Sequence, residues 1–233
     1  MSGKLFAIGT GPGSPDLITV RGARILGQVD ILYAPAGKKG GDSLALSIVR
    51  EYLTENVQIK ERHFPMSSNT AEKVQVWDEV TQEIVADVAA GKKVAFVSLG
   101  DVMLYSTWVS ILERLPKIDM EIIPGITSFA LIAARCARPL AMDQQSLAVL
   151  PCTAPEEELD NALKQHSALV LMKAASKFVQ VRELLAKNNL LEHAVLVSDA
   201  SLESEKQFRD LREVGEDEKL PYFTTIIVNK EWQ

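Results

Sequence analysis

The residues of this chain that could do chemistry begin with a glycine-rich segment. Residues 9–15 read GTGPGSP and follow a short apolar run, residues 5–8, that is typical of a buried strand. Pro15 is suited to the first position of a helix, with Ser14 as its N-cap. Glycine allows positive φ and close approach of the backbone to a ligand, so this order of elements indicates a nucleotide-binding loop. A tight turn without a ligand is the alternative that this segment alone leaves open.

Two common nucleotide sites do not fit the segment. A dinucleotide site requires an acidic residue at the end of the second strand, where it holds the ribose. The predicted second strand, residues 29–33, ends in Ala34 and Pro35, and Asp30 lies near its start. No Gly-Lys-Ser/Thr follows the glycines, which excludes a phosphate-binding P-loop, and Pro12 removes one backbone donor.

Two further motifs each follow a predicted strand. GDVMLYST occupies residues 100–107, and PGITSF occupies residues 124–129. Asp101 lies at the carboxyl end of a strand, where α/β sheets bind ligands, although an Asx turn would also explain it. Thr127 and Ser128 open a predicted helix, either as caps or as donors to a polar ligand group.

Composition restricts the class of protein. The chain has 233 residues, 47% of them hydrophobic, which is enough for one large or two small domains. A net charge of −6 disfavours a nucleic-acid partner. Two distant cysteines and no signal-peptide pattern predict a reducing, cytoplasmic location. The three histidines are scattered, so no metal site is expected, and no apolar stretch is long enough to span a membrane.

Strand and helix patterns alternate, which predicts an α/β fold with two domains, residues 1–123 and 124–233. The first domain is expected to hold a mainly parallel sheet and the second a mixed one. Residues 207–213 alternate in polarity and predict a hairpin with the last strand. Helices are predicted at residues 15–26, 43–52, 71–90, 108–115, 128–137 and 178–187. Strands are predicted at residues 5–8, 29–33, 93–99, 121–123, 146–150, 168–172, 194–197 and 224–228.

The three motifs together resemble the tetrapyrrole methylase family, which transfers methyl groups from S-adenosylmethionine (SAM). The order and spacing match over the whole chain, although Val102 stands where the family usually has proline. LYAPAGK at residues 32–38, SLA at residues 43–45 and MLYST at residues 103–107 resemble the branch that methylates C-20 of precorrin-2, or its cobalt complex, in cobalamin biosynthesis. The resemblance implies two α/β domains that differ from the usual methyltransferase fold, with the cofactor in the cleft between them, and a homodimer.

The resemblance also implies which residues form the site. Asp101 is the expected catalytic residue, as an orienting or proton-accepting group, and no strong base is needed because C-20 of the reduced ring is electron-rich. Met103, Tyr105 and Met172 have core packing as their alternative. The expected cofactor-binding residues are Pro12, Gly100, Asp101, Met103, Tyr105, Ser106, Thr127, Ser128, Met172, Ala200 and Thr225. Cations expected for the substrate carboxylates are Arg21, Arg24, Lys38 and Arg135.

Other functions remain open on the sequence. Within the family these are uroporphyrinogen-III C-methyltransferase, another precorrin methyltransferase, diphthine synthase and a ribosomal RNA methyltransferase. Outside enzymes, the same loops would suit a module that binds a nucleotide without catalysis. The segment at residues 33–38 favours C-20 methylation, and any cobalt would arrive within the substrate.

Overall fold

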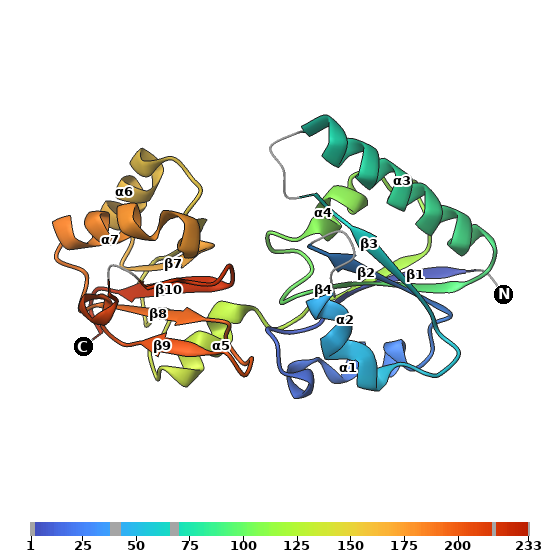
Figure 1. Cartoon of the computed structure of the whole chain (residues 1–233), viewed down its shortest axis with the longest axis horizontal. Helices are drawn as coiled ribbons and strands as arrows, with labels where there is room; N and C mark the ends of the chain where they lie inside the picture. Colours follow the sequence, from blue (N-terminus) through green and yellow to red (C-terminus); the bar gives the residue numbers. More distant parts are fainter. Residues whose placement is uncertain (1–2, 38–42, 66–69, 216–217, 233) are drawn as a thin grey trace. The chain divides into compact units, whose positions relative to one another are not determined.

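The chain folds into two compact units, Met1–Thr127 and Ser128–Gln233, each built on one five-stranded sheet (Figure 1). The structure is a computed structural model that describes residues 3–37, 43–65, 70–215 and 218–232. The predicted fold class, two α/β units, is confirmed. The predicted boundary after residue 123 stays a prediction. In the described residues, no helix is both long and apolar enough to cross a membrane.

The sheet of the first unit is parallel throughout, in the order β3-β2-β4-β1-β5. Its strands are β1 (Lys4–Gly9), β2 (Ile31–Ala36), β3 (Gln58–His63), β4 (Lys93–Ser98) and β5 (Met120–Ile123). From β1 the chain continues to β2 and then to β3 at one edge of the sheet. It then returns to β4, which lies between β2 and β1, and ends at β5 on the other side of β1. Ligands of open parallel sheets bind beyond the carboxyl ends of the strands, where the chain changes direction.

Helices cover both faces of this sheet (Figure 1). They are α1 (Val20–Leu26), α2 (Leu44–Val49), α3 (Thr70–Ala89) and α4 (Thr107–Leu112). Side chains alternate along a strand, so neighbours in β1 serve opposite cores. Leu5 and Ala7 pack with Ile84 and Trp108 of α3 and α4, whereas Ile8 packs with Leu26 of α1 and with residues of α2.

The first predicted helix differs from the observed structure. Residues 15–26 form a 3₁₀ turn, Pro15–Leu17, followed by α1. Thr19 caps α1, because its Oγ1 accepts the N–H of Gly22 at 3.1 Å, whereas Ser14 makes no cap bond. Pro15 opens the 3₁₀ turn with Ser14 at its N-cap position, as predicted, but the prediction of one continuous helix over residues 15–26 was wrong.

The sheet of the second unit is mixed, in the order β6-β7-β10-β8-β9. Its strands are β6 (Leu147–Pro151), β7 (Ala168–Met172), β8 (Ala194–Ser198), β9 (Lys206–Phe208) and β10 (Thr224–Asn229). Among the described strands of this unit, only β6 and β7 pair in parallel. The expected hairpin between residues 207–213 and the last strand was wrong, because β7 and β8 already occupy both edges of β10, and β9 pairs with β8 instead.

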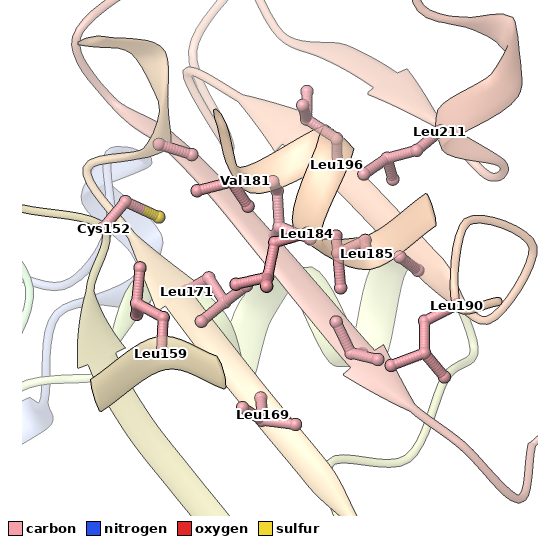
Figure 2. Packing of buried hydrophobic residues seen from close by; sticks show 14 of the residues in the cluster. Cys152, Leu159, Leu169, Leu171, Val181, Leu184, Leu185, Leu190, Leu196 and Leu211 are labelled. Atoms are coloured by element: carbon pink, nitrogen blue, oxygen red, sulfur yellow. The ribbon is translucent and has the colours of Figure 1, made fainter. Parts of the chain in front are cut away.

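The second unit also has a core on each face of its sheet. One contains α6 (Glu156–Gln165) and α7 (Phe178–Lys187), and the other contains α5 (Ser128–Arg135). Figure 2 shows the first core, in which Leu184 of α7 lies among side chains of β7 and β8. Cys152 is part of it, and burial raises the pKa of its thiol to about 12. The thiol therefore stays protonated and unreactive at neutral pH.

Two elements were absent from the predicted set. The strand β3 reads QIKERH and lies at the edge of the sheet. Its polar composition is not typical of a strand, so the sequence pattern did not predict it. The helix α6 reads EEELDNALKQ and buries only Leu159, Ala162 and Leu163. Those three follow helical spacing, so a signal was present among many charges.

Replacing Leu184 with Ala should lower the free energy of unfolding of the second unit by about 2–5 kcal/mol, because it leaves a cavity among packed side chains. Leu184 is 6% exposed. Val179→Ala is the matched control, since Val179 lies on the same helix and is 62% exposed. Urea unfolding of both variants measures the difference, and similar midpoints would contradict the packing described here.

Candidate functional site

The three motifs found in the sequence follow three adjacent strands of the first unit. Gly9 ends β1, Gly100 follows β4, and Gly125 follows β5, and β1 pairs with both β4 and β5. Since the strands are parallel, their carboxyl ends lie at one edge of the sheet. The structure therefore brings the motifs together where an α/β sheet binds ligands.

At that edge the backbones of three glycines touch. A Cβ added to Gly125 would lie 2.1 Å from the carbonyl oxygen of Gly100, and one added to Gly9 would lie 2.5 Å from the nitrogen of Gly125. Real Cβ atoms are not found at such distances from backbone atoms. Glycine is required here for close approach, and the result is an edge made largely of bare backbone.

The first and second motifs are also joined by a pair of hydrogen bonds. Gly100 donates its N–H to the carbonyl of Gly11 at 2.7 Å, and Gly11 donates to the carbonyl of Gly100 at 3.2 Å. Both residues have positive φ, +81° for Gly11 and +70° for Gly100. Pro12 follows this bridge and is buried. The bridge therefore fixes the predicted cofactor-binding residues Pro12 and Gly100 beside one another.

Asp101 links the second motif to the third. One carboxylate oxygen, Oδ1, accepts the N–H of Met103 at 2.9 Å, and the other, Oδ2, accepts the N–H of Gly125 at 2.9 Å. The first bond is the Asx turn that the sequence left open, and the second crosses between loops. Val102, the departure from the family pattern, buries its side chain in the core with Phe96 and Trp108.

The remaining residues of the second motif divide into capping and exposed side chains. The Oγ of Ser106 accepts the N–H of Trp108 at 3.1 Å and lies 2.7 Å from the Oγ of Ser98, so Ser106 caps α4. The side chains of Met103 and Tyr105 are 48% and 45% exposed. Two large side chains of the second motif are thus exposed, so the core-packing alternative for them is wrong.

The predicted residues of the second unit lie near one edge of its sheet. Met172 ends β7, Ala200 follows β8, and Thr225 lies near the start of the antiparallel β10. Asp199 donates its N–H to the carbonyl of Phe223 at 2.9 Å, which joins the two loops at this edge. Met172 and Ala200 pack in the core beside α5, so the packing alternative for Met172 is confirmed, and a binding role for these positions remains a prediction.

Thr127 and Ser128 lie where the two units divide, and both are partly buried. Ser128 is the first residue of α5. The expected site residues thus fall into two groups, one in each unit. Gly9, Gly11 and Gly125 were not among the predicted cofactor-binding residues. The glycine-rich motifs were the feature of the sequence that could have identified them.

A family model matches most of the chain, including all three motifs. The model of the tetrapyrrole (corrin/porphyrin) methylases matches residues 4–214. The chain belongs to this family. Among relatives, the cobalt-precorrin-2 C(20)-methyltransferase of Salmonella typhimurium is 58% identical over 234 residues, which cover 100% of this chain and 99% of that protein. The precorrin-2 C(20)-methyltransferase of Sinorhizobium sp is 32% identical over 237 residues, covering 97% of this chain and 95% of that protein.

A solved structure shows the same fold. The uroporphyrin-III C-methyltransferase of Thermus thermophilus, complexed with S-adenyl homocysteine, matches this methylase with a TM-score of 0.68. The match covers 97% of this chain and 92% of that chain at 19% identity. At this identity the likeness concerns the fold alone.

The cations predicted to bind the substrate carboxylates of the methylase have different surroundings. Arg21 forms an ion pair with Glu121, and its guanidinium holds the pKa of that carboxyl below the ordinary value. Arg135 pairs with Glu205 at 2.7 Å. Arg24 is exposed in the last turn of α1. Lys38 lies outside the described residues. Arg21 and Arg135 would have to exchange an acidic partner for a substrate carboxylate.

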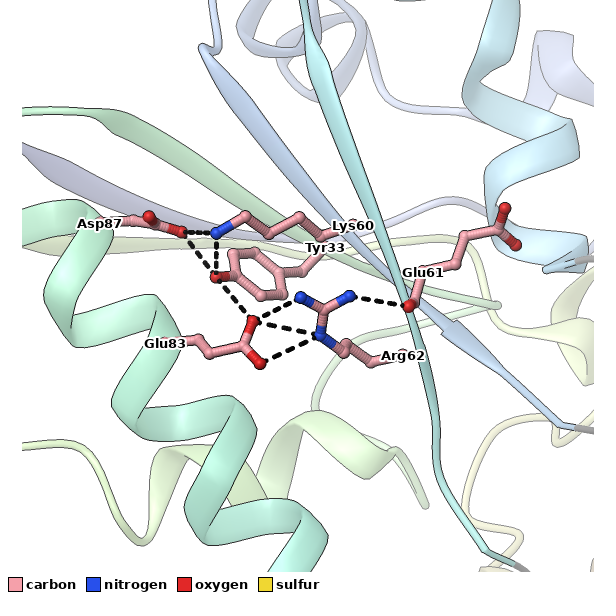
Figure 3. Close-up of polar contacts among 6 residues, drawn as sticks. All are labelled: Tyr33, Lys60, Glu61, Arg62, Glu83 and Asp87. Atoms are coloured by element: carbon pink, nitrogen blue, oxygen red, sulfur yellow. Dashed lines mark hydrogen bonds and ion pairs between the residues drawn. The ribbon is translucent and has the colours of Figure 1, made fainter. Parts of the chain in front are cut away.

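A polar cluster lies on the α3 face of the methylase sheet (Figure 3). The hydroxyl of Tyr33 on β2 donates to Asp87 of α3 at 2.6 Å, and Lys60 of β3 contacts both groups, at 3.1 Å and 2.6 Å. Arg62 pairs with Glu83, also at 2.6 Å. Lys60 and Arg62 are two residues apart on β3 and therefore face the same side. The cluster ties the edge strand β3 to α3, and sequence reasoning missed it together with β3.

The Tyr33 hydroxyl is held in its neutral form. Its side chain is fully buried. Burial, and then the hydrogen bond with Asp87, raise the pKa of Tyr33 well above its ordinary value of about 10. In the unfolded chain the phenol would ionise near that ordinary value, so folding becomes less favourable as the pH rises past it.

Gly125→Ala should destabilise the methylase by about 1–3 kcal/mol, because the added Cβ would force the Gly100 loop and the Gly125 segment apart. Gly215→Ala is the control, since a Cβ there meets nothing within 4 Å. Thermal unfolding of the two variants beside the wild type provides the comparison. Equal melting temperatures for both variants would show that the loops do not require a bare backbone at residue 125.

Tyr33→Phe should flatten the loss of stability at alkaline pH. In the wild type, the free energy of unfolding should fall as the pH rises above about 10, where an unfolded Tyr33 ionises and the folded one does not. Urea unfolding between neutral pH and about pH 11 measures both curves. Tyr222→Phe, at an exposed tyrosine, should follow the wild type. Parallel curves for wild type and Tyr33→Phe would refute the raised pKa.

Proposed function

We propose that this methylase transfers a methyl group from SAM to C-20 of precorrin-2 in cobalamin biosynthesis. The observation that carries the proposal is the 58% identity, over the full length of both chains, to the C(20)-methyltransferase of Salmonella typhimurium. Both C(20) relatives are named for methylation at the same carbon, but one is named for cobalt-precorrin-2 and the other for precorrin-2. The higher identity belongs to the cobalt form, so we propose cobalt-precorrin-2 as the substrate.

The bare backbone of the first unit fits a SAM site. Gly9, Gly100 and Gly125 leave an edge without side chains, where peptide N–H and C=O groups can approach a polar ligand. Residues that would hold the cofactor in this unit are Pro12, Gly100, Asp101, Met103, Tyr105, Ser106 and Thr127. From the second unit we add Ser128, Met172, Ala200 and Thr225. A location in a cleft between two domains stays a prediction from the family resemblance.

When bound, SAM supplies an electrophilic methyl group on a sulfonium. Since C-20 of the reduced ring is electron-rich, the chain's residues need mainly to align the two reactants and exclude water. Met103 and Tyr105 offer exposed apolar surface for that purpose. Asp101 is the candidate for orienting a reactant or accepting the proton that C-20 loses.

The substrate carries acetate and propionate groups, which require cations or other donors. Arg21, Arg24 and Arg135 are the described candidates, and Lys38 is a further one from the sequence. The chain has a net charge of −6, so binding a polyanionic ring depends on local positive charge. In the described residues, no group of three or more His, Cys, Asp or Glu side chains could hold a metal, and we propose that cobalt comes with the ring.

The proposal includes a homodimer in the cytoplasm. The cytoplasmic location is supported by two free, buried cysteines, which suit a reducing compartment. The dimer is supported only by the family resemblance. Sedimentation of the purified chain measures the oligomeric state directly.

Incubation with SAM and cobalt-precorrin-2 should yield a product heavier by one CH₂ unit, detected by mass spectrometry. Metal-free precorrin-2 in a parallel reaction should yield much less product, because the relative with 58% identity is named for cobalt-precorrin-2 and the one with 32% identity for precorrin-2. Uroporphyrinogen III is the negative control. Faster methylation of uroporphyrinogen III would assign a different family activity, and SAM binding without any methyl transfer would favour a module that only binds the nucleotide.

A further inference from the structure

We propose that Asp101 is a positioning residue, whose carboxylate fixes the segment after β5 against the loop after β4. By holding two glycine-containing loops in register, it sets the backbone groups that face SAM. The inference rests on the proposed function, because that function identifies the loops as the SAM site. It replaces the proton-accepting role of Asp101 with an orienting one that acts through the backbone.

The first support is how β5 ends. It is an edge strand that pairs with β1 alone, and its last residue is Ile123. Pro124 follows and has no N–H to donate. The N–H of Gly125 is therefore the first backbone donor after the strand, and it binds Oδ2 of Asp101 at 2.9 Å. The carboxylate of Asp101 therefore binds the chain directly after the last backbone hydrogen bonds of β5.

The second support is the arrangement of the carboxylate itself. Each oxygen accepts one backbone N–H, from Met103 in its own loop and from Gly125 in the neighbouring loop. Hydrogen bonds to an ionised acceptor are stronger than neutral ones. Taking up a proton would weaken this double attachment, so a proton-accepting role would loosen the site during the reaction.

The third support is the close packing of the loops. The contact between Gly125 and Gly100 leaves no room for a side chain, so small movements of the segment would separate or collide the backbones. Packing between glycines provides little apolar surface to resist such movement. A fixed hydrogen bond from Asp101 supplies the restraint that side-chain packing elsewhere provides.

The test compares Asp101→Asn and Asp101→Ala with the wild type in the full chain. Asn keeps the shape and one acceptor oxygen but points an NH₂ group at the other N–H, whereas Ala loses both bonds. The matched control is Asp30→Ala. Asp30 accepts the N–H of Lys93 at 2.8 Å, at the amino ends of the strands of the same sheet. Three measurements are made: amide hydrogen exchange at Gly125, affinity for S-adenosylhomocysteine by calorimetry, and kcat at saturating SAM.

Exchange at Gly125 in the ligand-free protein should quicken at least tenfold in Asp101→Ala, which keeps no acceptor, and stay unchanged in Asp30→Ala. The dissociation constant of S-adenosylhomocysteine should rise about tenfold in Asp101→Asn and up to about a hundredfold in Asp101→Ala. At saturating SAM, kcat should fall less than tenfold, because bound ligand restores the loop positions. Where kcat of the wild type falls at low pH, this acid limb should remain in Asp101→Asn.

A proton-accepting Asp101 would give the opposite pattern. Affinity would be unchanged, kcat would fall at least a hundredfold in both variants, and the acid limb would disappear, which overturns the inference. Unchanged exchange at Gly125 would also overturn it. If the wild type failed to bind S-adenosylhomocysteine, the proposed function would fall. The exchange rates would still decide whether Asp101 fixes Gly125.

Discussion

The contact of three peptide backbones, at Gly9, Gly100 and Gly125, is the constraint on which the site depends. Side chains would separate these loops, since Cβ atoms at Gly9 or Gly125 would overlap neighbouring backbone. The contact is possible only because β4, β1 and β5 are adjacent and parallel. Three distant parts of the sequence thus form one surface of bare backbone, joined by the Gly11–Gly100 bridge and by Asp101.

The strands that carry this surface are buried by helices on both sides. The helices pack on the two faces of the sheet, and each face has its own core. Burial of the strands makes the edge rigid, since β1 supplies Leu5 and Ala7 to one core and Ile8 to the other. Rigid strands hold the loops with the precision that alignment of two reactants requires.

Much of the fold could be predicted from the sequence, because apolar runs and glycine or proline breaks mark the central strands. Features set by tertiary partners could not. The polar strand β3 is explained only by Glu83 and Asp87 of α3, which pair with its cations. The pairing of β9 depends on which edges of β10 are already occupied. The same holds in the site: the motifs predicted Asp101, but the Gly125 amide lies 24 residues away in sequence, beyond any local pattern.

A residue that helps to identify the family branch from the sequence need not contact the substrate, and Tyr33 is an example. Tyr33 belongs to the segment that resembles the C-20 branch, yet its side chain is fully buried and bonded to α3. A fully buried side chain cannot touch a substrate, so the contacts of Tyr33 serve the packing of the sheet against α3. A site made of backbone can hold the same methyl donor throughout a family. Met103 and Tyr105 of the second motif are exposed, which makes them candidates for contacts that differ between substrates.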